Sequence, residues 1–300
     1  MVTCNMSNTV GRQSEGHSRA VSRRVDLHHL SLHIHERSHP GALPSVLLVH
    51  GLASNARLWD GAADALVELG YHVIAVDQRG HGQSDKPDEG YDMQTVADDL
   101  ASLITALQLD RPVVAGQSWG GNVVIELANR HPHLVRGVCA VDGGLIQLRD
   151  RFNNWESCAS VLAPPALAGT PFTRFEAMIR SAYRGWPETA VHGTLANMEV
   201  LIDGTIRPWL SRERHMQVLR GLWEHQPQTI IPKLSRPVLF TPADSESQHT
   251  VTKREDYARA AHHRHVRVEW FSPAHHDLHA QYPERWAGVL HTHISGGFLA

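Results

Sequence analysis

The motif Gly116-Gln117-Ser118-Trp119-Gly120-Gly121 contains a serine in a setting that suits nucleophilic chemistry. An apolar run ends at Ala115 and a helical pattern begins near Asn122, which is the strand–turn–helix context that a G-x-S-x-G elbow requires. The flanking glycines allow a sharp turn in which a Cβ would collide with neighbouring backbone. Such a turn presents the Ser118 hydroxyl at the N-terminus of a helix, where developing negative charge is favoured. We therefore predict that Ser118 is a nucleophile.

The elements that must position this serine can be read from the apolar pattern. Short apolar runs, typical of strands buried on both faces of a parallel sheet, occur at 46–49, 73–76, 112–115, 135–141 and 237–240, with one more strand at 266–271. Alternation over 25–35 predicts a half-buried strand or hairpin. Helical spacing occurs between the runs, at 57–69, 95–107, 122–130, 253–263 and 283–294. Alternating strands and helices predict an α/β fold with a mainly parallel central sheet flanked by helices.

One long segment, 145–233, interrupts this alternation and shows no clear buried strand. Its clearest helix covers 211–223, with Ser211 as the expected N-cap. The segment is too long for a plain loop, and the strand pattern resumes directly after it. We interpret it as an inserted helical cap, or lid, rather than as a second domain. Its tryptophans are Trp155, Trp186, Trp209 and Trp223.

The remaining chain divides into a core and an N-terminal extension. Residues 23–144 and 234–300 are expected to form the α/β core. Residues 1–22 are polar and show no periodicity, so we expect them to be disordered.

Composition excludes several partner classes. Of 300 residues, 42% are hydrophobic and 20% are charged, and the formal net charge is −3. This balance gives no reason to expect a nucleic-acid or anionic-membrane partner. No stretch reaches the roughly 18 apolar residues of a membrane helix, and residues 1–18 lack the apolar core of a signal peptide. We expect a cytoplasmic protein, and a homodimer stays open.

The 23 histidines raise the question of a metal site. Those at 262, 263 and 265 cluster, but no acidic or cysteine partner stands at ligand spacing nearby. The three cysteines are too few and too scattered for a disulfide framework. We predict neither a metal nor a cofactor.

Three further motifs occur in an order that resembles the α/β-hydrolase fold family, and the likeness extends from about Arg24 onward. His50-Gly51-Leu52 follows the first long buried run, where the family places its oxyanion loop. The sequence DQRGHGQS at 77–84 resembles the family's D-x-R-G-x-G-x-S loop, and AHHDLH at 274–279 resembles its late catalytic-histidine segment. The resemblance implies an α/β-hydrolase fold with a helical lid.

The resemblance also implies roles for individual residues. The backbone N–H groups of Leu52 and Trp119 would form the oxyanion hole, while His50 would hold its loop in place. The 77–84 loop would brace turns near the site. For the general base, alignment of the Asp277-Leu278-His279 stretch with the family pattern selects His276. His275 stands where the family usually has glycine and is the fallback.

The acid that orients the base has two competing positions. Most family members supply it after the strand that follows the lid, where this chain has Asp244 and Glu246. The other placement, found in some haloalkane dehalogenases, follows the strand after the nucleophile helix. Asp142 stands there, 24 residues after Ser118, although an aspartate at such a place also occurs as a strand-end cap. Both positions keep the order serine, acid, histidine.

The chemistry implied is two-step acyl transfer, in which Ser118 forms an acyl-enzyme that water then hydrolyses. An aromatic-rich lid favours a small to medium organic substrate, and we expect a carboxylic ester or lactone. A serine departs from the aspartate of epoxide hydrolases and haloalkane dehalogenases, so those activities are disfavoured. The alternatives are hydrolysis of a carbon–carbon bond in a ring-cleavage product and a ligand-binding receptor on the same fold. A receptor that had lost turnover would often lack a triad member, whereas all are present here.

Overall fold

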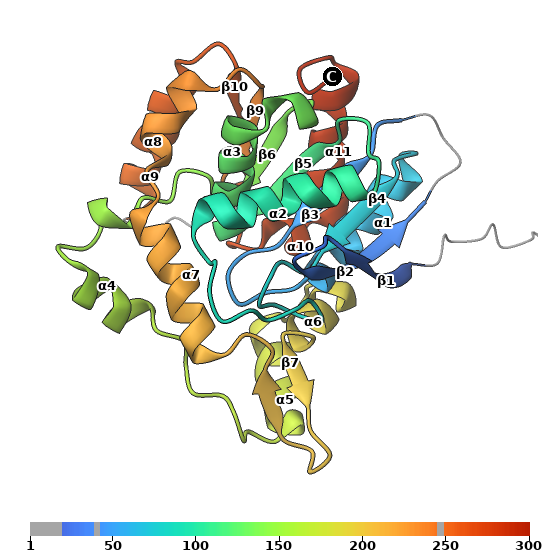
Figure 1. Cartoon of the computed structure of the whole chain (residues 1–300), viewed down its shortest axis with the longest axis vertical. Coiled ribbons are helices and arrows are strands. Elements are labelled where there is room, and N and C mark those ends of the chain that lie inside the picture. Colours follow the sequence, from blue (N-terminus) through green and yellow to red (C-terminus); the bar gives the residue numbers. More distant parts are fainter. Residues whose placement is uncertain (1–19, 39–42, 245–248) are drawn as a thin grey trace, which may run out of the picture.

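The computed structural model describes residues 20–38, 43–244 and 249–300. These residues form an eight-stranded sheet with helices on both faces, so the predicted α/β fold with a mainly parallel sheet is confirmed. Figure 1 shows the sheet at the centre of the molecule. Its strands are β1 (Val21–Asp26), β2 (Ser31–Arg37), β3 (Val46–Val49), β4 (Val73–Val76), β5 (Val113–Gln117), β6 (Val138–Val141), β9 (Val238–Thr241) and β10 (Val266–Val268).

The order across the sheet is β1-β2-β4-β3-β5-β6-β9-β10. Strand β2 runs antiparallel to both β1 and β4, and all the other neighbouring pairs are parallel. Strands β5, β6 and β9 are therefore adjacent and parallel, and their carboxyl ends meet at one edge of the sheet. Ligand sites of open α/β sheets form at this kind of edge.

The N-terminal boundary differs from the sequence expectation. Residues 1–19 lie outside the described part, but β1 begins at Val21, inside the segment 1–22 that was expected to be disordered. Strand β1 is an edge strand, and most of its side chains are exposed. Polar residues such as Arg23 and Arg24 suit such an edge, which is why composition alone did not indicate a strand.

Two layers of helices cover the sheet. The described helices are α1 (Asp60–Glu68), α2 (Met93–Ala106), α3 (Trp119–Arg130), α4 (Trp155–Leu162), α5 (Phe172–Ala182), α6 (Glu188–Leu195), α7 (Arg212–Glu224), α8 (Pro227–Ile230), α9 (His249–Ala261), α10 (Leu278–Gln281) and α11 (Pro283–Ser295). Short 3-10 helices lie at Ala56–Trp59, Pro132–Leu134, Leu148–Asp150 and Ile231–Lys233. Helices α1, α10 and α11 pack on one face, and α2, α3 and α9 pack on the other.

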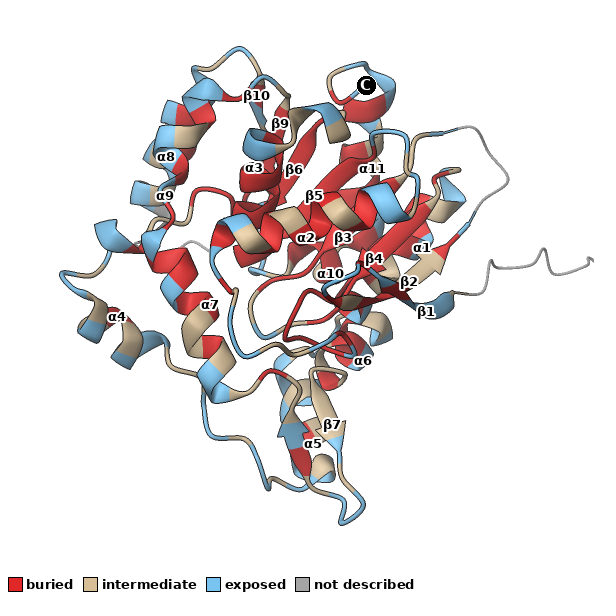
Figure 2. Ribbon diagram, viewed as in Figure 1, coloured by how far each residue is buried: buried red, intermediate tan, exposed pale blue. Residues whose placement is uncertain are grey.

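Successive side chains of a strand point to opposite faces of the sheet, and helices cover both faces of the central strands. In β3, Val46 and Leu48 pack with α1 and α11, whereas Leu47 and Val49 pack with α2 and α3. Burying both sets removes apolar surface from water on each side at about 25 cal/mol per Å². Figure 2 shows the central strands buried along their length, between helices that expose their outer faces. The continuous apolar runs of the sequence are the consequence of this arrangement.

The inserted segment 145–233 lies between β6 and β9 and contains helices α4 to α8. Ser211 caps α7, and its side chain accepts a hydrogen bond from the Arg214 N–H at 3.3 Å. A small antiparallel hairpin, β7 (Met198–Val200) with β8 (Ile206–Pro208), was not expected from the sequence. Its strands are only three residues long, too short to produce a clear periodic pattern. Figure 1 shows the hairpin and α5 projecting away from the core.

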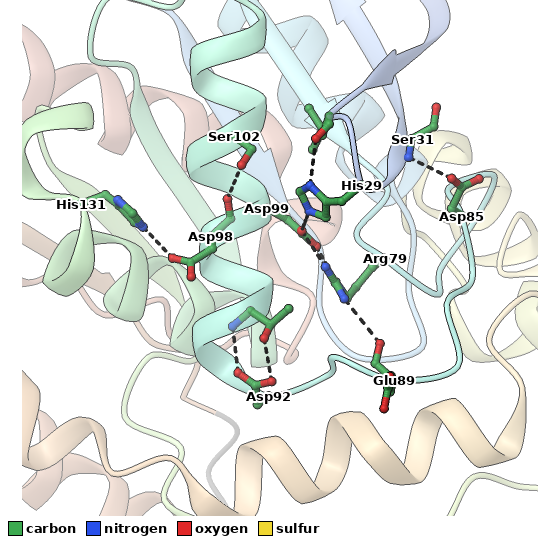
Figure 3. Close-up of polar contacts among 12 residues, drawn as sticks. His29, Ser31, Arg79, Asp85, Glu89, Asp92, Asp98, Asp99, Ser102 and His131 are labelled. Carbon is green, nitrogen blue, oxygen red and sulfur yellow. Dashed lines mark hydrogen bonds and ion pairs between the residues drawn. The ribbon is translucent and has the colours of Figure 1, made fainter.

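The loop after β4 is joined to α2 by a buried ion pair. Figure 3 shows Arg79 extending from this loop to Asp99 of α2, with an Nη2–Oδ1 distance of 2.7 Å. The His29 ring binds the same carboxylate at 3.0 Å. Asp92 caps the start of α2 by accepting from the Thr95 N–H at 2.8 Å. These contacts fix the loop that carries His81, which lies beside the candidate site.

None of the helices in the described ranges combines the length and the hydropathy needed to cross a bilayer.

Candidate active site

Ser118 stands at a strained turn between β5 and α3. Its φ is 55° and its ψ is −120°, a conformation that costs a non-glycine residue free energy and persists only where the surroundings enforce it. A Cβ on Gly116 would lie 2.1 Å from the Gly120 carbonyl oxygen, and a Cβ on Gly120 would lie 2.4 Å from the His50 carbonyl oxygen. The glycines of the motif therefore allow the close backbone approach that the turn needs.

Asp142 and His276 form the central contact of the site. Asp142 directly follows β6, and its Oδ2 lies 2.6 Å from His276 Nδ1. Its other oxygen, Oδ1, accepts a hydrogen bond from the Ala243 N–H at 2.8 Å and is paired with the ammonium group of Lys253. The Asp142 side chain is 8% exposed and that of His276 is 46% exposed, so a buried acid supports a half-buried ring.

The competing acids occupy different places. Asp244 follows β9, and its Oδ2 binds the guanidinium group of Arg254 on α9. Glu246 lies outside the described residues. Of the two described candidates, Asp142 is therefore the one that the structure brings to the ring of His276.

The contact between Asp142 and His276 shifts the pKa values of both side chains. Burial alone would raise the pKa of Asp142, but the hydrogen bond and charge of His276, together with Lys253, hold it below its ordinary value. Burial alone would lower the pKa of His276, and the hydrogen bond and charge of Asp142 outweigh this and raise it. A carboxylate on Nδ1 leaves Nε2 free to accept a proton, which is what a general base requires.

Ser118 and His276 are connected through bonds of adjacent residues rather than by a direct bond. Among the described residues, the Ser118 hydroxyl forms no hydrogen bond with His276. Gln117, which precedes the serine, lies with its Nε2 3.4 Å from the His276 carbonyl oxygen, and the Ser118 N–H donates to Val141, which precedes Asp142, at 2.9 Å. In enzymes without bound substrate the serine–histidine contact is often long and tightens only in the complex.

The expected oxyanion donors lie on two rigid supports. Trp119 is the first residue of α3, where backbone N–H groups have no acceptor within the helix. Leu52 follows Gly51 in the loop after β3, and within the described chain its N–H has no hydrogen-bond partner. His50 holds this loop as expected: its Nδ1 lies 2.7 Å from the Gly51 carbonyl oxygen and its Nε2 accepts from the Gln78 N–H at 3.0 Å.

His81, which belongs to the 77–84 loop, also lies at the site. Its Nε2 accepts from the Ala53 N–H at 3.2 Å, and its ring stacks on Trp119 with centroids 5.4 Å apart. Burial, followed by the charge of His50, holds the pKa of His81 well below its usual range, so the ring is neutral. His81 thus contacts Ala53, which follows Leu52, and the side chain of Trp119, and its sequence signal is its place in the 77–84 loop.

The inserted segment reaches the histidine loop through two aromatic residues. Tyr183 and Trp186 stack with ring centroids 4.2 Å apart, and Trp186 meets the ring of His275 edge-on at 5.0 Å. The Tyr183 hydroxyl donates to Asp277 Oδ2 at 3.2 Å. The fallback base His275 therefore faces the inserted segment, while Asp277 connects that segment to the loop of His276.

His279, the third histidine of this loop, is a core residue. It is fully buried and packs against Trp59 with ring centroids 4.0 Å apart and the ring planes tilted by 42°. Burial lowers its pKa to about 4, so the ring stays neutral at physiological pH. Within the described ranges, no group of three His, Cys, Asp or Glu side chains is arranged to hold a metal ion.

The chain matches a known family and curated relatives. A family model described as the alpha/beta hydrolase fold matches residues 44–174, which run from β3 into the inserted segment. A curated relative, 2-(acetamidomethylene)succinate hydrolase of Mesorhizobium japonicum, is 30% identical over 75% of this chain and 78% of its own length. Epoxide hydrolase A of Mycobacterium tuberculosis is 38% identical over 40% of this chain and 38% of its own length.

Two solved structures superpose on most of this chain. The crystal structure of E-2-(acetamidomethylene)succinate hydrolase superposes with a TM-score of 0.74 and 26% identity, covering 92% of this chain and all of that one. The thioesterase domain from the curacin biosynthetic pathway gives a TM-score of 0.73 at 16% identity, covering 91% of this chain and all of that domain. The second likeness concerns the fold alone.

Proposed function

The chain belongs to the α/β-hydrolase fold family and is a hydrolase, and we propose that it cleaves a carboxylic ester or lactone of a small to medium organic substrate through an acyl-enzyme on Ser118. The observation that carries this proposal is the 2.6 Å contact between Asp142 Oδ2 and His276 Nδ1 at the sheet edge where the strained Ser118 turn stands. A serine elbow, a histidine and a buried carboxylate at one sheet edge are the parts that acyl transfer needs.

In the first step, the Ser118 Oγ attacks the substrate carbonyl carbon while His276 Nε2 takes the hydroxyl proton. The carbonyl oxygen becomes negative as the C–O double bond opens, and the N–H groups of Leu52 and Trp119 stabilise it. Loss of one such donor costs roughly 3–4 kcal/mol of barrier in comparable enzymes. The alcohol leaves with the proton from His276, and the acyl group stays on Ser118 as an ester.

In the second step, water attacks the acyl-enzyme. His276 takes a proton from the water, the tetrahedral species collapses, and the proton passes to the Ser118 oxygen as the acid leaves. Asp142 holds the ring in the tautomer with hydrogen on Nδ1 and stabilises the imidazolium in both steps. No oxidant, reductant or metal enters this balance.

The serine also argues against the activity of the epoxide hydrolase relative. Opening an epoxide by way of an alkyl-enzyme ester needs a carboxylate nucleophile, and this chain carries a hydroxyl at that position. The 38% match to that relative covers only 40% of this chain, so it supports the family more than the reaction.

A second candidate is amide hydrolysis, which is favoured by the 30% identity to 2-(acetamidomethylene)succinate hydrolase over three quarters of this chain. The name of that substrate denotes an acetamido group on a dicarboxylic acid. In this chain, attack of Ser118 on such an amide carbonyl would use the same base and oxyanion donors. The two candidates differ in leaving group, an alcohol in one and an amine nitrogen in the other.

Fluorophosphonate labelling tests the shared mechanism. We expect one adduct per chain, mapped to Ser118 by mass spectrometry, absent in Ser118→Ala and slowed by orders of magnitude in His276→Ala. Absence of an adduct on the folded wild-type protein would reject the proposal and favour a ligand-binding receptor. A panel of p-nitrophenyl esters and lactones, assayed beside 2-(acetamidomethylene)succinate at equal concentration, then separates the two candidates by their kcat/KM values.

A further inference from the structure

A cation is bound to the acid of the proposed triad. Lys253 extends from α9, and its ammonium group pairs with Asp142 Oδ1, the oxygen that does not contact His276. The same ammonium donates to the Ala243 carbonyl oxygen at 2.6 Å, and the Ala243 N–H donates to Asp142 Oδ1 at 2.8 Å. Lys253 and Ala243 thus hold one side of the carboxylate, and His276 occupies the other.

This arrangement fixes the direction of the carboxylate. Asp142 has a φ of 42°, and its side chain is 8% exposed, so its position depends on protein contacts rather than on water. With Oδ1 held by a backbone N–H and an ammonium group, Oδ2 is directed at His276 Nδ1. The Ala243 N–H still holds Oδ1 when the ammonium group is removed, so loss of Lys253 loosens this direction only in part and the lost charge has the larger effect on His276.

The charge of Lys253 also opposes the rise that Asp142 causes in the pKa of His276. A carboxylate near a histidine favours the protonated ring, and a cation on that carboxylate reduces the attraction. Other described groups nearby are Asp277, which adjoins His276, and Tyr257, whose hydroxyl donates to the Gly143 carbonyl oxygen at 3.0 Å. Asp244 lies beside Ala243 and is paired with Arg254. Within the described chain, His276 and Lys253 are the two groups that form ion pairs with Asp142.

Resting on the proposed function, we propose that Lys253 is a positioning residue that directs Asp142 at His276 and limits how strongly this carboxylate stabilises the protonated ring. The inference follows from two bonds of one ammonium group, to Asp142 and to the Ala243 carbonyl oxygen. The lysine charge keeps part of the base in its neutral, active form at lower pH than Asp142 alone would allow. This direction agrees with the charge of Lys253, which lowers the pKa of both Asp142 and His276.

An NMR titration tests this inference without relying on turnover. Protein labelled with 15N-histidine is titrated as wild type, Lys253→Met and Lys253→Arg, and the His276 signals are assigned from their absence in His276→Gln. We expect the His276 midpoint to rise by about 0.5–1 pH unit in Lys253→Met and to stay near the wild-type value in Lys253→Arg. The acidic limb of the kcat/KM profile should move upward by the same amount.

Arg254→Met is the matched control, because Arg254 is the next residue of α9 and pairs with Asp244 instead of Asp142. It should move the His276 midpoint by no more than about 0.2 unit. An unchanged or lowered midpoint in Lys253→Met, in protein whose melting temperature matches that of Lys253→Arg, would overturn the inference. If Ser118 takes no fluorophosphonate but the midpoint rises in Lys253→Met, the proposed function fails while the placement of Lys253 stands.

Discussion

The Tyr183 hydroxyl lies 3.2 Å from Asp277 Oδ2, so a side chain of the inserted segment is bonded to the residue that follows the proposed base. The other oxygen of Asp277, Oδ1, accepts from Gln117 Nε2 at 3.1 Å, and Gln117 precedes the proposed nucleophile. One carboxylate therefore joins the inserted segment, the histidine loop and the serine turn. Movement of the inserted segment away from the histidine loop would break the Tyr183–Asp277 bond.

The first prediction concerns this connection. Tyr183→Phe should lower kcat/KM about 3- to 30-fold, mainly through KM, because the inserted segment loses its hydrogen bond to the carboxylate beside the proposed base. Burial raises the pKa of Tyr183 to about 12, so the phenol is a donor throughout the working pH range and the effect should not vary with pH. Steady-state kinetics on the best ester of the panel measures it.

Tyr71→Phe is the control for this prediction. The Tyr71 hydroxyl bonds His291 Nδ1 at 2.9 Å on the α11 side of the sheet, so the substitution removes a similar contact outside the site. Equal losses in both variants would mean that the Tyr183–Asp277 bond has no special effect on substrate binding.

The second prediction separates the two acids. Asp142→Asn should reduce kcat by about 10³- to 10⁴-fold, because an amide cannot stabilise the imidazolium and can turn its NH₂ group toward Nδ1. Asp244→Asn should reduce kcat less than about tenfold, since the Asp244 carboxylate pairs with Arg254. Comparable losses in both variants, with melting temperatures near wild type, would contradict the triad as assigned.

Much of the fold could be predicted because buried strands and helices have characteristic patterns of apolar residues. The run at 46–49 coincides with β3 and the run at 73–76 with β4, since strands buried on both faces must be apolar throughout. The β7–β8 hairpin was missed because its strands are short and only partly buried.

The Ser118 turn could be predicted because its motif is contiguous in the sequence. Contacts between residues far apart in the chain could not be predicted in the same way. Asp142 and Asp244 follow the adjacent parallel strands β6 and β9, so both aspartates suit a loop that reaches this edge of the sheet. Only the tertiary arrangement separates them. Likewise, no spacing rule links Lys253 to Asp142 or Tyr183 to Asp277, because these contacts depend on how helices and loops pack.

The third prediction is a pH dependence. Burial alone would lower the pKa of His276, but the hydrogen bond and charge of Asp142 outweigh it and raise the pKa above the ordinary value of 6.5. The base acts only when neutral, so kcat/KM should fall as pH drops through this raised value and should level off above it.

Profiles of kcat/KM over roughly pH 5 to 9 measure this limb. In Asp142→Asn the favourable charge is lost, so the limb of the residual activity should move to lower pH. An upward movement in that variant would show that Asp142 does not set the titration of His276.

The fourth prediction uses two helical glycines as a matched pair. Gly120→Ala would place a Cβ 2.4 Å from the His50 carbonyl oxygen and 2.7 Å from that of Val49, so α3 must shift away from the loop that carries the expected oxyanion donor. We expect a loss of about 2–4 kcal/mol in the free energy of unfolding, with lower kcat in the protein that folds.

Gly288 lies within α11, and a Cβ added there would have no neighbouring atom within 4 Å. Gly288→Ala should therefore stabilise the protein by up to about 1 kcal/mol, through helix propensity alone. Urea unfolding of both variants gives the two values, and a Gly120→Ala protein as stable and active as wild type would refute the close approach of α3 to this loop.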